Sequence, residues 1–192
     1  MLGIGLMLGF CALAPLGDGI AKAVGPVIPL AQVLFVRFAV QALTLSPALA
    51  GAHRQALTTR IWAWTAVRTG LHILGIGAMF LSLRYLPIAD AIAIAFVMPF
   101  ILLLLGRYLL GEEVGWRRMT ACVFGFAGTL LVIQPSFVRV GSAALLPLAV
   151  AVSFALFMLV TRRIAKDIDP VPLQAASGLL ATAVLVVLLC IG

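Results

Sequence analysis

Two ionisable residues, Arg68 and His72, lie four positions apart inside the mostly apolar stretch 62–86. That spacing places both side chains on one face of a helix, with Trp64 one turn earlier and Gly75 continuing the stripe. A guanidinium binds hydrogen-bond acceptors, and an imidazole changes charge near neutral pH. We therefore expect the stripe to line a polar cavity in which His72 titrates. The structural alternative is that Arg68 extends to the membrane surface while His72 bonds a backbone carbonyl.

A second pair, Asp18 and Arg37, belongs to neighbouring apolar stretches. At 1.5 Å per residue, Asp18 lies about 9 Å and Arg37 about 12 Å below the same end of their helices. Charges at such depth normally have a partner or face a water-filled cavity. We expect an ion pair that acts as a gate or coupling site, with Arg37 also lining the cavity. The alternative is an ion pair that only fixes the hairpin.

Stretch 88–110 carries two further candidates. Asp90 lies in its first turn, where it either lines the cavity or simply stabilises the positive end of the helix dipole. Pro99 lies midway and predicts a kink, because it lacks an N–H and crowds the preceding turn. A kink at membrane depth suits a substrate site or a hinge. Farther along, Gly125 and Gly128 predict close packing against another helix.

The composition indicates what must position these residues. Of 192 residues, 64% are hydrophobic and only 10% are charged, whereas soluble domains carry about 25% charged residues. Long apolar runs without strand-like alternation predict an all-α integral membrane protein. Turn signals divide the chain into seven spans of suitable length. They cover roughly residues 2–23, 29–50, 62–86, 88–110, 116–135, 141–161 and 172–191.

The basic residues predict the orientation. The net charge is +7, but the residues are scattered among apolar runs, so no nucleic-acid partner is expected. With a cytoplasmic N-terminus, eight basic residues fall in inner connections and three in outer ones, which is a positive-inside bias. The eight are Arg54, Arg60, Arg107, Arg117, Arg118, Arg162, Arg163 and Lys166, and the three are Lys22, Arg84 and Arg139. We expect a multi-pass protein of the bacterial inner membrane.

Enzyme chemistry is not expected. The chain has three cysteines in separate apolar runs, with no metal-ligand spacing. It has no paired intramembrane aspartates, no Gly-x-Ser-x-Gly and no His-Glu-x-x-His. We predict no catalytic residue, no metal and no cofactor. A nucleotide-binding loop is also missing from the sequence, so a gradient of an ion or proton, or exchange, would drive any transport.

The chain also repeats itself. The stretch GIAKAVGPVIPLAQ at 19–32 resembles RIAKDIDPVPLQ at 163–174, and six of the eighteen residues 10–27 are identical at an offset of 144. Five spans separate the two copies, so they cross in opposite directions. This predicts an inverted repeat, with the substrate site between its units. Residues 1–136 would form a complete five-helix unit and 137–192 the first two helices of a second.

Two units of 144 residues would need 288, so the 192 residues are expected to be a fragment or a truncated product. Whether two copies assemble as a homo-oligomer to supply the missing helices stays open.

The stretch from Leu83 to Pro135 carries a family resemblance. Its motifs are Tyr85-Leu86-Pro87, the small residues after Asp90, Pro99, Leu110-Gly111-Glu112, and Gly125 to Gly128 before Pro135. They resemble the EamA type of the drug/metabolite transporter superfamily, as do Asp18, Lys22, Pro29, Gln32 and Arg37 near the N-terminus. The resemblance implies ten helices in two inverted repeats.

We therefore expect a secondary transporter, or a fragment of one. It would move small metabolites, amino acids or drugs across the cytoplasmic membrane by alternating access. The alternative is an intramembrane structural or assembly protein that transports nothing.

Overall fold

The computed structural model describes residues 27–51, 58–111, 113, 115–133 and 141–191, with isolated positions 5, 8, 9, 13, 16, 19, 20 and 23. Most of the first predicted span, 2–23, lies outside the described residues, and Asp18 is among those left out. The described part of the chain is helical, as the composition predicted. All helices, contacts and exposed fractions refer to this part of the chain.

The helices follow the predicted spans closely. They are α2 (Leu30–Gly51), α3 (Thr59–Tyr85), α4 (Ile88–Ala95), α5 (Met98–Leu110), α6 (Trp116–Ile133), the 3₁₀ turn η1 (Gly141–Ala144), α8 (Leu145–Ile164) and α9 (Pro170–Ile191). Five stretches of the described residues are long and apolar enough to cross a bilayer. They are Leu30–Pro47, Thr59–Tyr85, Ile88–Leu109, Leu145–Ile164 and Pro170–Cys190.

The predicted span 88–110 is broken into α4 and α5. The N–H of Val97 donates to the carbonyl of Ile94, three residues back, instead of making a helical bond four residues back. Pro99 lies in the first turn of α5, where its missing N–H costs nothing. The kink predicted from Pro99 is thus confirmed as a short interruption at Phe96 and Val97. The second half of the span ends at Gly111, whose φ of 66° is left-handed.

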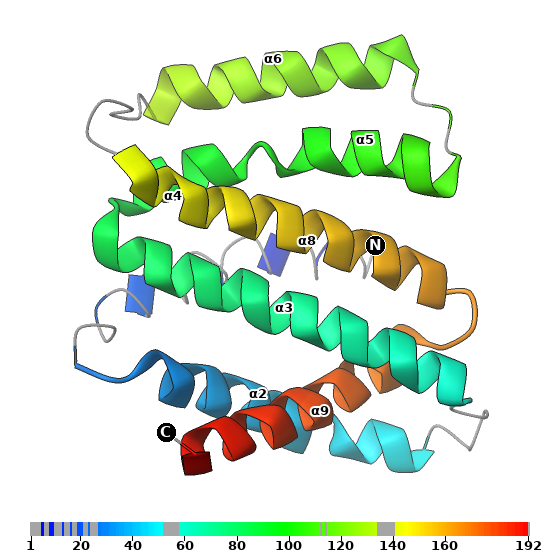
Figure 1. Ribbon diagram of the computed structural model, residues 1–192. Helices are drawn as coiled ribbons and strands as arrows, with labels where there is room; N and C mark the ends of the chain where they lie inside the picture. The colour runs from blue at the N-terminus through cyan, green and yellow to red at the C-terminus, as the bar shows by residue number, and fades with distance from the viewer. Residues whose placement is uncertain are drawn as a thin grey trace.

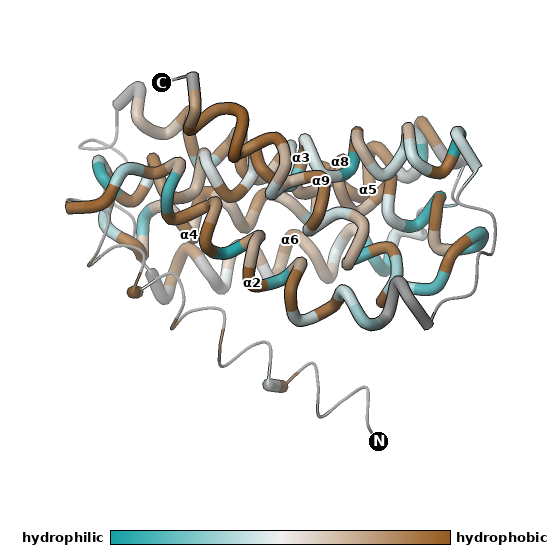
Figure 2. Tube along the Cα trace, turned by 90° about the horizontal axis from the view of Figure 1, so that it is seen from below, coloured by the Kyte–Doolittle hydropathy of each residue, from teal (hydrophilic) through white to brown (hydrophobic). Residues whose placement is uncertain are grey.

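The helices lie side by side, and successive spans run in opposite directions, with α4 and α5 continuing in one direction as the two halves of a single span (Figure 1). The two most extensive contacts join α2 to α9 and α3 to α8. Both pairs are antiparallel, and α2 and α9 cross each other at a visible angle (Figure 1). Helix α8 lies between α3 and the α4–α5 pair, while α6 packs on α4 and α5. Hydrophobic residues dominate the helices along their length (Figure 2).

The buried core lies where α2, α3 and α9 meet. It includes Leu34 and Phe38 of α2, Ile76, Phe80 and Leu83 of α3, Leu86 directly after α3, Ala91 of α4, and Ala181 and Leu185 of α9. Close helix approach occurs at Gly178, where an added Cβ would lie 3.1 Å from the backbone nitrogen of Ala42. The close packing predicted at Gly125 and Gly128 is not found against the described helices, since no described atom lies within 4 Å of a Cβ built at either glycine.

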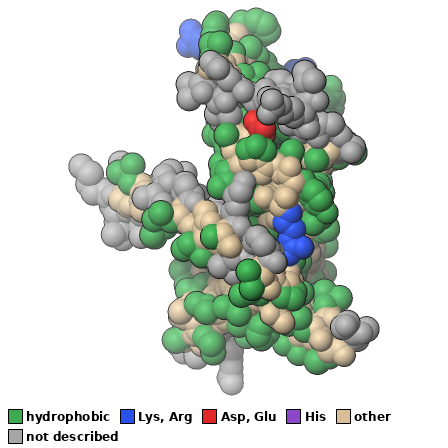
Figure 3. Space-filling model, turned by 90° about the vertical axis from the view of Figure 1, so that its left-hand side faces the viewer, with side chains coloured by type: hydrophobic (Ala, Val, Ile, Leu, Met, Phe, Trp, Pro, Cys, Tyr) green, Lys and Arg blue, Asp and Glu red, His purple; other side chains and the backbone are tan. Residues whose placement is uncertain are grey.

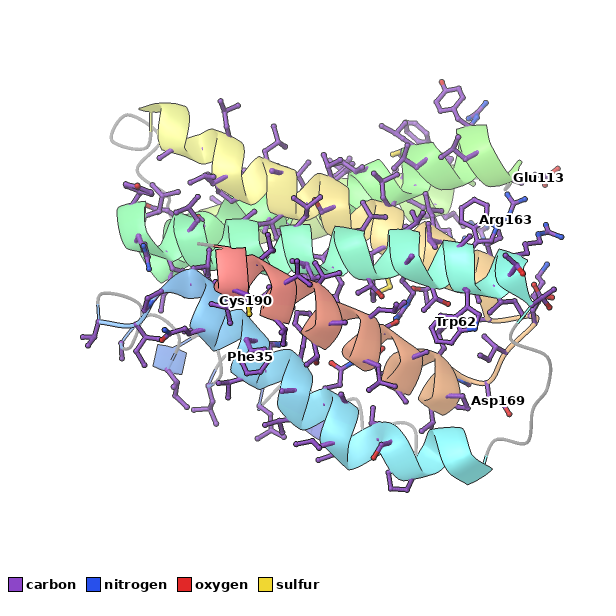
Figure 4. The ribbon with its side chains drawn as sticks, turned by 60° about the horizontal axis from the view of Figure 1, so that its bottom comes forward. Phe35, Trp62, Glu113, Arg163, Asp169 and Cys190 are labelled. Carbon is purple, nitrogen blue, oxygen red and sulfur yellow. The ribbon has the colours of Figure 1, made fainter. Side chains whose placement is uncertain are left out.

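Charged residues gather at one end of the bundle. Arg60 begins α3, Arg107 ends α5, and Arg162 and Arg163 end α8. Figure 4 shows Glu113, Arg163 and Asp169 at this end, with Phe35 and Cys190 toward the other. The opposite end shows mostly hydrophobic and neutral side chains with scattered charges (Figure 3). We call the first of these the basic end.

Candidate functional site

Arg68 is the most deeply enclosed charged side chain among the described residues, with 5% of its surface exposed. Its Nε donates a hydrogen bond to Thr161 Oγ1 at 2.9 Å. One terminal nitrogen donates to Ser177 Oγ at 2.5 Å, and the other donates to Gln174 Oε1 at 2.8 Å. All three acceptors are neutral. The guanidinium is therefore held in a fixed position without a carboxylate partner among the described residues.

These hydrogen bonds join four helices. Arg68 belongs to α3, Thr161 to α8, and Gln174 and Ser177 to α9. Helix α2 contributes Gln41, whose Nε2 donates to the backbone carbonyl of Gln174 at 2.9 Å. We call these five residues the Arg68 junction. The hydroxyl of Thr161 is itself oriented, because it donates to the carbonyl of Phe157 at 2.7 Å, which leaves its oxygen lone pairs available to Arg68.

Aromatic rings pack next to the junction, along α3 in the direction of His72. The guanidinium carbon of Arg68 lies 4.4 Å from the ring centroid of Phe157, within range of a cation–π interaction. The imidazole of His72, one turn along α3, lies 4.8 Å from the same ring. Phe38 of α2 meets His72 edge-on at 5.3 Å, and Phe154 of α8 does so at 6.0 Å. We call Phe38, His72, Phe154 and Phe157 the ring cluster.

His72 carries an unused polar atom inside this cluster. Its Nδ1 is buried and has no hydrogen-bond partner among the described residues. Buried polar atoms are nearly always paired, so an unpaired one suggests a ligand, a water or strain. The stripe predicted from the sequence is therefore present, with Arg68 and His72 directed into one region between α2, α3, α8 and α9. The alternative, in which Arg68 snorkels and His72 bonds a backbone carbonyl, is not what the described contacts show.

The helices that form the junction carry positive charges but no negative ones. The sequences of α2, α3, α8 and α9 contain Arg37, Arg68, Arg60 and others but no aspartate or glutamate. An ion that is buried and balanced only by neutral dipoles is costly to maintain. Such residues in membrane spans generally mark a substrate path or a site of charge movement.

Gly75 provides the space that the ring cluster needs. A Cβ built on Gly75 would lie 3.0 Å from Cε2 of Phe154. The glycine in the predicted stripe thus allows α8 to bring its aromatic ring against α3. Any larger side chain at Gly75 would displace the Phe154 ring.

The other predicted site residues lie elsewhere. Arg37 is exposed on α2 and forms no hydrogen bond within the junction, and its predicted partner Asp18 lies outside the described residues. Asp90 is buried in the first turn of α4, with 8% of its surface exposed. Pro99 is half-buried in the first turn of α5. Neither α4 nor α5 supplies a hydrogen bond to the Arg68 junction.

Sequence reasoning missed the residues that hold Arg68. Gln41, Phe157, Thr161, Gln174 and Ser177 were not singled out, although Gln174 closes the second copy of the repeated stretch. Amide and hydroxyl side chains on apolar spans were the available signal, since they hydrogen-bond across helices in lipid. No group of three or more metal-ligating residues occurs among the residues that the structure describes.

The comparison with known families agrees with the motifs between Leu83 and Pro135. The model of the EamA-like transporter family matches residues 1–134. The chain belongs to the EamA-like transporter family. It is therefore a multi-pass membrane protein of a transporter family, not an enzyme family. This confirms the resemblance read from the sequence.

Several bacterial transporters are similar to this chain. A riboflavin transporter of Rhizobium johnstonii is 38% identical over 95 residues, which cover 50% of this chain and 32% of that protein. A riboflavin transporter of Vibrio cholerae is 28% identical over 145 residues, which cover 74% of this chain and 49% of that protein. An S-adenosylmethionine uptake transporter of Rickettsia prowazekii is 24% identical over 148 residues, which cover 77% of this chain and 50% of that protein. The chain thus spans half the length of these relatives or less. No solved structure matches it.

Proposed function

We propose that this chain forms part of a secondary transporter that moves a small metabolite, amino acid or drug across the cytoplasmic membrane by alternating access. The observation that carries the proposal is the Arg68 junction. It is a buried guanidinium whose acceptors among the described residues are all neutral, at the meeting point of four membrane helices. Such a group is the expected mark of a site where a transported molecule binds.

The arrangement of helices supports an inverted repeat. We assign residues 1–136 to a first five-helix unit and 137–192 to the first two helices of a second, inverted unit. Under this assignment α2 and α9 are equivalent helices, and they are an antiparallel, crossing pair. The junction then draws α2 and α3 from one unit and α8 and α9 from the other. The interface between inverted units is where transporter substrate sites usually lie.

The charge distribution supports an orientation. The basic end would face the cytoplasm, as the positive-inside tendency requires, with a cytoplasmic N-terminus in the bacterial inner membrane. Arg68 is nine residues after Thr59, the start of α3, which places it about 14 Å from that end. The substrate would be held in the cytoplasmic half of the membrane. A proton, another ion or exchange would drive its movement.

The relatives narrow the substrate. Riboflavin and S-adenosylmethionine are the first molecules to test, because similar proteins are named for them. Both contain planar rings that could stack on the ring cluster. We also propose supporting roles for the remaining residues. Arg37 and Asp18 would form a gate, Asp90 would line the path, and Pro99 would act as a hinge.

Uptake into proteoliposomes tests the proposal. The protein purified from its native membrane is first weighed intact, because a mass above the 20.2 kDa of these 192 residues would mean that further helices are present. It is then reconstituted and offered labelled riboflavin, S-adenosylmethionine and a panel of amino acids, with and without an ion gradient. We expect saturable uptake of at least one compound.

The controls separate transport from leak. Arg163→Gln removes a charge from the exposed basic end, outside the junction, and should leave uptake intact, while Arg68→Gln should abolish it. If no compound enters above the rate of empty liposomes, the transport proposal is overturned and the structural or assembly role takes its place. If uptake requires two copies of a 20.2 kDa chain, a homo-oligomer supplies the missing helices.

A further inference from the structure

The Arg68 junction also limits what kind of molecule can bind there. This inference rests on the proposed function and concerns the chemical class of the substrate. Each terminal nitrogen of Arg68 carries two N–H groups, and each makes one hydrogen bond among the described residues. The guanidinium therefore has donors left over. The bonds it makes go to a hydroxyl and an amide, which are weaker acceptors for it than a charged or strongly polarised oxygen.

The surroundings favour one sign of charge. Helices α2 and α3 carry Arg37 and Arg68, and the four helices of the junction have no acidic residue in their sequences. A ligand with a positive charge would meet like charges, and no acidic residue of the four described helices would compensate them. A neutral or negative ligand with acceptor oxygens would satisfy the unused N–H groups. Charge and hydrogen bonding thus point to the same ligand class.

The ring cluster adds a shape requirement. Phe38, His72, Phe154 and Phe157 bring four rings together next to the guanidinium. Rings of this kind accept a flat ligand by offset or edge-on packing. The Nδ1 of His72, which has no hydrogen-bond partner among the described residues, offers one more hydrogen-bonding atom at the edge of such a ligand. In the present structure Gln174 and Ser177 take the positions on Arg68 that ligand oxygens would take.

We propose that Arg68 selects the substrate by binding the acceptor edge of a planar ring system that is uncharged or anionic, and that the junction excludes cations. The ligand's oxygens replace the side chains of Gln174 and Ser177 on the guanidinium, while its ring packs against Phe157 and His72. Of riboflavin and S-adenosylmethionine, the neutral flavin fits this rule and the sulfonium cation does not.

Two flat tricyclic probes of opposite character provide the test. Lumiflavin is neutral and has carbonyl acceptors, whereas proflavine is a cation that carries donors. Binding of each to the purified full-length protein is measured by equilibrium dialysis in detergent. We expect lumiflavin to bind at least about tenfold more tightly, because a hydrogen bond to a charged group contributes about 1.5–3 kcal/mol. This comparison uses the unaltered protein, so it does not depend on any variant folding.

Two substitutions then localise the effect. Arg68→Gln should weaken lumiflavin binding about tenfold or more and reduce the preference over proflavine. Arg163→Gln, which removes an equal charge from the exposed basic end, should leave both affinities unchanged. Equal or tighter binding of proflavine overturns the inference, and so does a preference that survives Arg68→Gln or a failure of lumiflavin to bind at all.

The test separates this inference from the proposed function. If a compound is taken up but lumiflavin does not bind, the transport proposal stands and the proposed selection by Arg68 is overturned. Conversely, if lumiflavin binds selectively but no compound is taken up, the proposed selection by Arg68 stands and the transport proposal is overturned.

Discussion

The helices around Arg68 and those around Pro99 are held together in different ways. Helices α2, α3, α8 and α9 are joined by directional hydrogen bonds from side chains of Arg68 and Gln41. Helices α5 and α6 contact each other through the edge-on rings of Phe100 and Phe126, 5.7 Å apart. In lipid there is no hydrophobic driving force between helices, so such a contact rests on van der Waals packing, which is less directional than a hydrogen bond. The first region should therefore be fixed in geometry, and the second should be free to adjust.

The largest effect on stability is expected from a substitution where α2 and α9 cross. Gly178→Val should lower the free energy of unfolding by about 2–3 kcal/mol, because its Cβ would meet the backbone of Ala42. Gly128→Val on α6 is the matched control, with no described atom near its Cβ, and should change stability little. Denaturant titration in mixed micelles measures both. Similar losses for the two variants would mean that the regions do not differ.

The next effect tests the hydrogen bonds of the junction. Thr161→Val keeps the shape of the side chain but removes the acceptor of Arg68 Nε. We expect a loss of about 1–2 kcal/mol, because a buried charged donor is left unpaired. The comparison is Thr44→Val, since Thr44 is exposed on α2 and its hydroxyl bonds only within its own helix. An unchanged unfolding midpoint for Thr161→Val would show that the bond to Arg68 contributes nothing.

A smaller effect is expected at the link to α2. Gln41→Leu removes the hydrogen bond to the carbonyl of Gln174, and such bonds between membrane helices contribute about 0.6 kcal/mol on average. Gln32→Leu, at an exposed position of the same helix, should be neutral. The two unfolding curves are recorded side by side. A larger loss at Gln32 than at Gln41 would contradict the role given to the link.

The smallest change in stability should come from the broken helix. Pro99→Ala allows α4 and α5 to join, and the added hydrogen bond offsets the lost rigidity, so stability should change by less than about 0.5 kcal/mol. Uptake should nevertheless slow severalfold, because the interruption would serve as a hinge. Pro47→Ala is the control, since Pro47 lies inside an uninterrupted α2. Normal uptake by Pro99→Ala would remove the hinge from the mechanism.

Local sequence signals predicted the helices well. Apolar run length gave the spans, Gly111 and Pro87 gave ends of helices, and Pro99 gave the interruption of the fourth span. These features depend on residues within one or two turns of each other. The family could be recognised for the same reason, because its motifs are short and contiguous.

The partners of Arg68 could not be predicted in this way. Thr161, Gln174 and Ser177 follow it by roughly a hundred residues, and their side chains reach it only because of how α3, α8 and α9 rotate and pack. Helix rotation also decides which neighbours small residues such as Gly125 and Gly128 meet. A spacing of small residues allows close approach but does not determine which helix approaches.

The pairing of α2 with α9 has a consequence for biosynthesis. Helix α2 ends at Gly51 and its main partner begins only at Pro170. At about 5–20 residues per second, a ribosome needs roughly 6–24 seconds to cover that distance. During this time the side-chain amide of Gln41 and the surface around Ala42 lie in the membrane without their contacts to α9. A helix in this position is a natural client for an insertase or chaperone that shields it until α9 arrives.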